Sequence, residues 1–335
     1  MGSASCDRGL HPDPPTARAE GELRMTVVSE TAPAPAPTPT RAERSERTQY
    51  ERRLGLTLSA PAFIVMIIVT AYPLAYAVVM SLFRYRLTDP EGRKFVGLKN
   101  YLTVLTDPIW WSAVSTTLVI TLFSVAVELV LGFGFAWVMY RIIRGRSVIR
   151  TGILIPYGIV TVVSAYIWRY AFQLDSGFVN QWLGLGDFNW FGERWSSLFV
   201  ITLSEIWKTT PFISLLLLAG LVQVPGELLE AATVDGATPW QRLWRVTLPN
   251  MKAAIMVALL FRTLDAWRIF DNPFIMTAGA NDTETLSFLA YRQNVTLVNL
   301  GAGSAVSVLL FFTVVLIAFV FVKGFKTDLS QVRGE

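Results

Sequence analysis

Four ionisable residues recur at every third position of one strongly apolar stretch of this chain: Arg262, Asp265, Arg268 and Asp271. In a helix, this spacing places neighbours on one face within pairing distance. Charges inside hydrocarbon cost about 2.5–3.5 kcal/mol each on insertion scales, so they need partners or water. Two interpretations follow. The four residues line a path, with Asn272 and Trp267 offering hydrogen bonds and a stacking face to a ligand, or they form an internally paired ladder that fixes helix packing.

Two further apolar stretches carry charges. Glu205 and Lys208 are three residues apart, and the same two interpretations, path lining or internal pairing, apply to them. Glu128 has no oppositely charged residue at helical spacing, so we expect it to meet a basic residue on another helix or subunit.

The residues that most often carry catalysis are scarce. The single cysteine, Cys6, excludes an internal disulfide and a cysteine metal site, and the single histidine, His11, lies in a Pro-rich segment away from the apolar stretches. No Gly-x-x-x-x-Gly-Lys-Ser/Thr phosphate loop is present, so this chain is not expected to hydrolyse ATP. We predict a non-catalytic chain with no catalytic residue, no metal and no cofactor of its own.

Composition indicates the membrane. Of the 335 residues, 53% are hydrophobic and only 16% are charged, which is too little charge to cover a soluble domain of this length. The net charge of +4 is typical of basic loops at a membrane surface rather than of nucleic-acid binding. Residues 1–50, rich in Pro and Ala, are predicted to be a disordered cytoplasmic tail, and residues 51–335 a transmembrane domain.

The apolar stretches predict an all-α membrane protein with six spanning helices, because each stretch can cross about 30 Å of hydrocarbon. The predicted spans are 56–83, 113–140, 149–172, 197–222, 253–277 and 300–325.

The distribution of basic residues predicts the orientation. If both termini are cytoplasmic, the inside segments carry fifteen Lys and Arg residues and the outside segments seven. The exception is the first external loop, which alone holds five, from Arg84 to Lys99. We therefore expect both termini to be cytoplasmic.

The loop 223–249 has the pattern of a short helical hairpin on the cytoplasmic face. Pro225 can open a helix, and Glu227 and Glu230 suit its first turns near the positive end of the dipole. Gly236 can end it, because glycine adopts positive φ without strain. Pro239 starts a second short helix, and Pro249 interrupts the chain before the next span.

This loop resembles the EAA motif of ABC-importer permeases: Glu-Ala-Ala, three residues, Gly, nine residues, an aliphatic residue, one residue and Leu-Pro. Val246 stands where Ile is commoner in the family. The resemblance implies the transmembrane fold of type I ABC importers, with the hairpin as a coupling helix that docks on a separate ATPase. The residues it assigns to coupling are Glu227, Glu230, Ala231, Ala232, Asp235, Gly236, Ala237, Leu248 and Pro249.

Segments 95–101 and 107–111 resemble the maltose- and glycerophosphate-type first permease of the family's sugar branch. Two others, 154–163 and 258–272, resemble the first permease subunit of actinobacterial trehalose importers. Gly279-Ala280-Asn281 departs from the usual Gly-Gly-Pro, which affects the expected local backbone. The resemblance covers residues 55–326.

This likeness implies a subunit that forms half of a sugar path. Its partners would be a second homologous permease, an ATPase dimer that binds ATP and Mg²⁺, an extracytoplasmic sugar-binding (lipo)protein and membrane lipid. The alternative is a stand-alone secondary transporter that uses the Arg/Asp ladder as an ion relay, although no inverted repeat is apparent.

Overall fold

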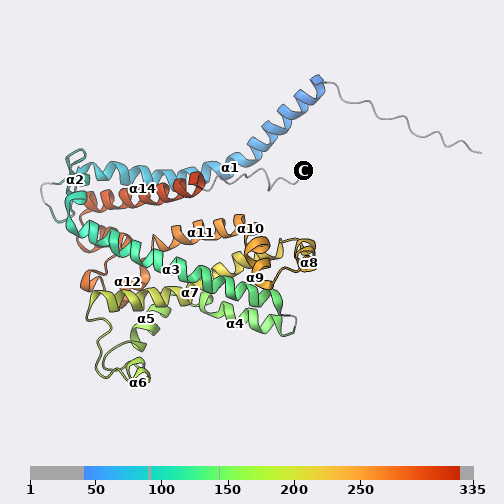
Figure 1. Ribbon diagram of the computed structural model, residues 1–335. Helices are drawn as coiled ribbons and strands as arrows, with labels where there is room; N and C mark the ends of the chain where they lie inside the picture. Colours follow the sequence, from blue (N-terminus) through green and yellow to red (C-terminus); the bar gives the residue numbers. More distant parts are fainter. Residues whose placement is uncertain (1–40, 90–91, 143, 325–335) are drawn as a thin grey trace, which may run out of the picture. The chain divides into compact units, whose positions relative to one another are not determined.

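The computed structural model describes residues 41–89, 92–142 and 144–324 (Figure 1). Most of the predicted tail lies outside these residues. Helix α1 (Arg41–Ser81) begins at Arg41, within the last ten residues of the predicted tail, and the division at residue 50 stays a prediction. The chain divides into two compact units at Phe63, and α1 begins in the first unit and ends in the second.

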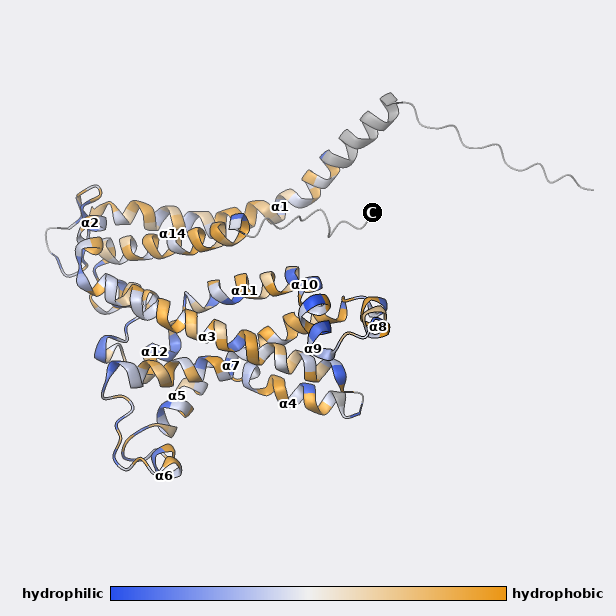
Figure 2. Ribbon diagram, viewed as in Figure 1, coloured by the Kyte–Doolittle hydropathy of each residue, from blue (hydrophilic) through white to orange (hydrophobic). Residues whose placement is uncertain are grey.

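Four helices are long and apolar enough to cross a membrane: α1, α3 (Pro108–Arg141), α7 (Arg194–Val222) and α14 (Leu300–Gly324). They correspond to the first, second, fourth and sixth predicted spans. Hydrophobic residues extend along α3, α7, α14 and the part of α1 from Arg53 to Ser81, whereas hydrophilic residues gather in the loops between them (Figure 2).

The third predicted span, 149–172, is wrong as a single helix. Its residues form α4 (Arg146–Gly158) and α5 (Thr161–Ala171), which meet at an angle of 88°. Pro156 lacks a backbone N–H, and Ile159 and Val160 are extended, so the helical hydrogen-bond ladder stops there.

The fifth predicted span, 253–277, is also wrong as a single helix. Helix α11 (Lys252–Ala266) has 15 residues, and after a break at 267–270 the short α12 (Asp271–Met276) follows. The described residues thus contain four candidate spans, or five if α4 and α5 are counted as one. Six spans with both termini inside remain a prediction.

Short elements connect the long ones. Strands β1 (Phe83–Arg84) and β2 (Lys94–Phe95) pair antiparallel beyond the end of α1. The others are α2 (Lys99–Thr106), α6 (Val179–Leu183), α8 (Gly226–Val234), α9 (Pro239–Arg242), α10 (Leu248–Asn250) and α13 (Leu286–Tyr291), the 3-10 turn η2 (Ala280–Asp282), and the π-helical turns η1 (Leu243–Thr247) and η3 (Arg292–Thr296). Ala278 and Asn281 adopt positive φ around η2, which is uncommon for residues other than glycine. The backbone is therefore unusual at Gly279-Ala280-Asn281, the segment that departs from the usual Gly-Gly-Pro.

Helices α3 and α7 pack side by side, and α11 packs against both. Two apolar clusters lie along them. One contains Ile120 of α3 and Ile201 of α7, and the other, further along both helices, contains Ala136 and Leu217. The residues between these clusters are therefore held at the middle of both helices.

Gly220 is predicted to be essential for the contact of α7 with α11. A Cβ atom at Gly220 would lie 2.3 Å from Cβ of Ala254, which is too close. We expect Gly220→Ala to reduce the free energy of unfolding by about 1–3 kcal/mol, because one helix must move away from the other. Denaturant unfolding in detergent micelles measures the change.

Gly134 of α3 provides the matched control, because a Cβ atom there meets nothing within 4 Å. Gly134→Ala should leave stability unchanged or raise it slightly, since alanine favours helix. Equal effects of the two substitutions would contradict the proposed contact.

Candidate functional site

A charged cluster lies between the two apolar clusters, at mid-depth of α3 and α7. Its centre is Arg262 of α11, whose side chain is fully buried. Glu128 of α3 is also fully buried, and Glu205 of α7 nearly so. At 1.5 Å per residue, Glu128 and Glu205 are each more than about 15 Å from either end of their helices. The cluster therefore lies near the middle of two candidate spans.

The guanidinium of Arg262 is almost saturated with acceptors. Its Nε and Nη2 donate to the two carboxylate oxygens of Glu128, at 2.5 and 3.0 Å. Nη2 also donates to Oε1 of Glu205 at 2.9 Å, and Nη1 to Oδ2 of Asp265 at 2.7 Å. These bonds join three helices at one planar fork, a geometry that suits arginine and not lysine.

Two neutral side chains complete the cluster. Thr209 donates its hydroxyl to Oε1 of Glu128 at 2.7 Å, and Asn272 donates Nδ2 to Oε2 of Glu205 at 2.7 Å. The amide oxygen Oδ1 of Asn272 is buried and has no hydrogen-bond partner within the described part of the chain. A buried acceptor without a partner can receive a hydrogen bond from a ligand hydroxyl or from water.

A cavity of about 580 Å³ opens beside the cluster. It lies where the two helix breaks face α7, with walls from the α4–α5 break, from α7 and from the α11–α12 break. Its lining residues are Tyr157, Ile159, Val160, Thr161, Glu205, Lys208, Thr209, Asp265, Arg268, Ile269, Phe270, Asp271 and Asn272. Irregular backbone at membrane depth is tolerated where it lines such a cavity.

Side chains from distant segments stabilise both breaks. Lys208 of α7 donates Nζ to the carbonyl oxygen of Ile159, which has left the helical ladder. At the other break, Thr285 donates its hydroxyl to the carbonyl oxygen of Ile269 at 2.9 Å. The freed carbonyls are thus satisfied without straightening the helices.

The structure decides between several sequence expectations. Glu128 does meet a basic residue on another helix, as predicted. Of the four residues in the predicted ladder, only Arg262 and Asp265 form an ion pair with each other. Arg268 instead donates Nε to the carbonyl of Leu264, and within the described residues it makes no ion pair with Asp271.

Two further expectations are corrected. Glu205 pairs with Arg262 and not with Lys208, which caps the α4–α5 break. Trp267 does not line the cavity, because its indole is buried against α14 and donates to Thr313 at 2.9 Å. Sequence reasoning missed Thr209, although it lies four residues after Glu205 and so on the same helix face.

The loop 223–249 forms the predicted hairpin. Pro225 precedes α8, Gly236 has φ of +77° after it, and Pro239 is the first residue of α9. Thr238 accepts from the backbone N–H of Gln241, whose side chain accepts from the Thr238 N–H, so a capping box starts α9. Pro249 lies inside α10, and the chain turns at Met251 before α11.

The hairpin presents an uncovered surface. No residue of α8 or α9 is buried, and the predicted coupling residues from Glu227 to Ala237 all lie on α8 and its turn. Two large apolar side chains flank the turn, Val234 at 87% exposure and Trp240 at 67%. Arg242 donates Nη1 to the hydroxyl of Thr233 at 2.6 Å, which ties the two helices together.

Comparison with known proteins identifies the family to which the chain belongs. Residues 128–330 match the family described as binding-protein-dependent transport system inner membrane component. The chain is 51% identical over 275 residues to the trehalose transport system permease protein SugA of Mycobacterium tuberculosis, covering 82% of this chain and 89% of the relative. It is 37% identical over 279 residues to the trehalose/maltose transport system permease protein MalF of Thermococcus litoralis, covering 82% and 94%.

A solved structure agrees in fold. A chain of a bacterial ABC transporter that imports the acidic polysaccharide alginate has a TM-score of 0.72, at 20% identity, and the match covers 86% of this chain and all of that one. The resemblance drawn from the EAA-like loop and its neighbouring segments is confirmed. The chain belongs to the binding-protein-dependent transport system inner membrane components, the permease subunits of ABC importers.

Proposed function

We propose that this chain is the first permease subunit of an ATP-driven sugar importer in a bacterial inner membrane, and that its substrate is a disaccharide, trehalose. Two relatives named as trehalose or trehalose/maltose permeases support the substrate. A second homologous permease would complete the path. An ATPase dimer would supply the energy by binding ATP and Mg²⁺, and an extracytoplasmic binding (lipo)protein would deliver the sugar.

One observation supports the proposal above all. A single run of chain, from Gly226 to Asn272, joins the uncovered hairpin to the cavity through α9, η1, α10 and α11. Movement of the hairpin by a docked ATPase would therefore be transmitted along α11 to the break at 267–270. That break lines the cavity, so its displacement would change which side of the membrane the cavity faces.

The cavity offers the chemistry that a neutral sugar needs. The side chain of Asp265 is 62% exposed and can accept from hydroxyls, while Arg268 can donate to them. The amide oxygen of Asn272 still has a free acceptor site. Tyr157 and Phe270 provide aromatic walls for the apolar faces of sugar rings.

Gly236 provides the test of coupling. Gly236→Val is expected to abolish ATP-dependent trehalose uptake, because a β-branched residue is strained at φ of +77° and would rebuild the turn between α8 and α9. Uptake of radiolabelled trehalose and ATPase co-elution are measured on the complex reconstituted in vesicles.

Gly226→Ala is the control within the same hairpin, because glycine there has an ordinary φ and a Cβ atom meets nothing within 4 Å. It should preserve uptake. Full uptake by the Gly236→Val complex, or uptake by this chain without an ATPase, would contradict the proposal.

A further inference from the structure

Helix α2 is short, lies between two spanning helices, and has three distinct faces. One face is docked on the protein: Asn100 donates Nδ2 to the carbonyls of Ser81 and Phe83, at 2.7 and 2.9 Å, and Val104 is buried. Ser81 is the last residue of α1, and Pro108 begins α3 two residues after α2 ends. Helix α2 is therefore held between the end of α1 and the start of α3, at the ends of two candidate spans (Figure 1).

The exposed part of α2 is itself divided into two faces. Leu98, at its N-cap, and Leu102 are 67% and 64% exposed, and Leu105 continues the same stripe, followed by Ile109 at the start of α3. At 100° per residue Leu98, Leu102 and Leu105 fall within a narrow sector of α2, whereas Ile109 belongs to α3, beyond the extended Asp107. Lys99, Thr103 and Thr106 occupy the adjoining sector and are also exposed. A helix with one face packed on the protein, one exposed apolar face and one exposed polar face is typical of the membrane interface.

Basic residues surround this stripe. Between Arg84 and Lys99 the sequence has five basic and two acidic residues. Arg86, Arg93 and Lys99 are exposed, and Arg93 lies over the rings of Phe83 and Tyr85, at 5.6 and 5.0 Å from their centroids. This is the loop that departs from the positive-inside distribution. Phosphate headgroups would complement such a positive charge beside an exposed apolar stripe.

We infer that α2 and the β1–β2 hairpin form a binding site for anionic phospholipid. The stripe from Leu98 to Ile109 inserts among the acyl chains, and Arg86, Arg93 and Lys99 hold the headgroup phosphate. Trp111 of α3, also exposed, continues the apolar surface and donates its indole N–H to the carbonyl of Leu105 at 2.9 Å. With the orientation proposed above, the site is in the outer leaflet.

Spin labels test the insertion. Because Cys6 is the single cysteine, Cys6→Ala provides a clean background for Leu102→Cys and, as a matched neighbour off the stripe, Thr103→Cys. The full chain, purified with its accompanying subunits, is placed in phosphatidylglycerol nanodiscs. The label at 102 should be accessible to oxygen and shielded from a water-soluble nickel reagent, and the label at 103 the reverse. If the label at 102 is shielded from both oxygen and the nickel reagent, a protein partner covers this position. If it is accessible to the nickel reagent, the position faces water. Either result overturns the inference.

Photo-crosslinking tests the headgroup. A phosphatidylglycerol probe with a reactive headgroup should label the segment 84–99, and a phosphatidylcholine probe should label it weakly. Arg93→Gln and Lys99→Gln should each lower the labelling about fivefold. Lys323→Gln, at the far end of α14, should leave it unchanged. Equal labelling by both probes, or no effect of the two substitutions, would overturn the inference.

Discussion

Replacement of Arg262 by Met is expected to reduce the free energy of unfolding by about 3–5 kcal/mol, the largest effect predicted for any single change in this chain. The variant would leave the carboxylates of Glu128 and Glu205 buried, next to each other and without their cation. Thermal unfolding of the purified complex measures the loss, and transport should fall with it. Arg262→Lys should restore only part of the stability, because an ammonium cannot match the fork geometry.

Arg268→Met is the control, since Arg268 lies on the same segment and lines the cavity but forms no hydrogen bond or ion pair with either glutamate. It should change stability by less than about 1 kcal/mol. The double variant Arg262→Met with Glu128→Gln should be more stable than Arg262→Met alone, because one buried negative charge is removed. If Arg262→Met is as stable as the wild type, the cluster does not hold the helices together.

The sequence predicts the long helices well because their apolar runs are continuous. It also predicts the local part of the charged cluster, since Arg262 and Asp265 are three residues apart on one helix. The convergence of Glu128 and Glu205 on Arg262 is not visible, because 134 and 57 residues separate them from it and only the packing of α3, α7 and α11 brings them together.

The helix breaks were mispredicted for a related reason. Composition favours one helix through 253–277, and nothing local besides Pro273 interrupts it. The break is stabilised from elsewhere, because Thr285 donates to the carbonyl of Ile269. Beyond the break, Arg169 of α5 donates to the carbonyl of Ile275 at 2.8 Å, near the C-terminal end of α12. Hydrogen bonds from distant side chains replace those of the helix, so the break costs little in the folded chain.

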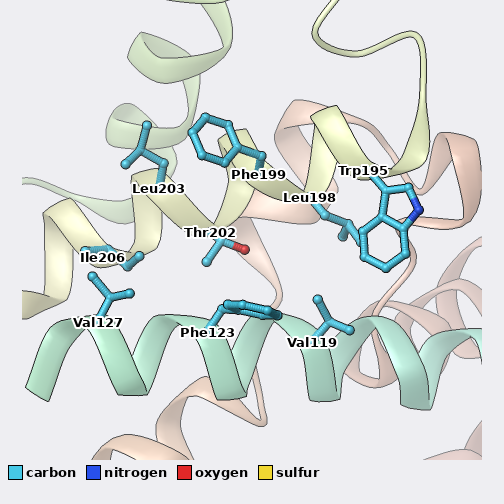
Figure 3. Close-up of a pocket in the computed structure, with 9 residues that line it drawn as sticks. All are labelled: Val119, Phe123, Val127, Trp195, Leu198, Phe199, Thr202, Leu203 and Ile206. Atoms are coloured by element: carbon cyan, nitrogen blue, oxygen red, sulfur yellow. The ribbon is translucent and has the colours of Figure 1, made fainter.

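The outer surface of α3 and α7 has an apolar groove that no other part of the described chain covers. A groove of about 350 Å³ between α3 and α7 is lined almost entirely by apolar side chains, including Phe123, Phe199 and Trp195 (Figure 3). Such a surface is stable in hydrocarbon, where it would not be in water. The exposed apolar residues of the hairpin differ from those of the groove. They belong to a loop that we propose to bind the ATPase in the aqueous phase, where exposed apolar side chains are not stabilised by lipid.

The double substitution Val234→Ser and Trp240→Ala is therefore expected to weaken ATPase binding about thirtyfold or more, the loss typical of a buried aromatic anchor at an interface. Both side chains flank the turn of the hairpin and are largely exposed in the isolated chain. Their truncation removes little packing from the permease itself, so its thermal stability should stay within about 1 kcal/mol of the wild type. Affinity is measured with the ATPase in solution and the permease immobilised in nanodiscs.

Trp182→Ala supplies the matched control, because this tryptophan of α6 is 80% exposed and lies outside the hairpin. It should bind the ATPase as the wild type does. A loss of affinity that appears equally in the control would indicate a general effect of removing an exposed indole. Unchanged affinity in the double variant would mean that the ATPase grips the hairpin through its polar residues, and Glu227 and Glu230 would then be the positions to change, since both are exposed on α8.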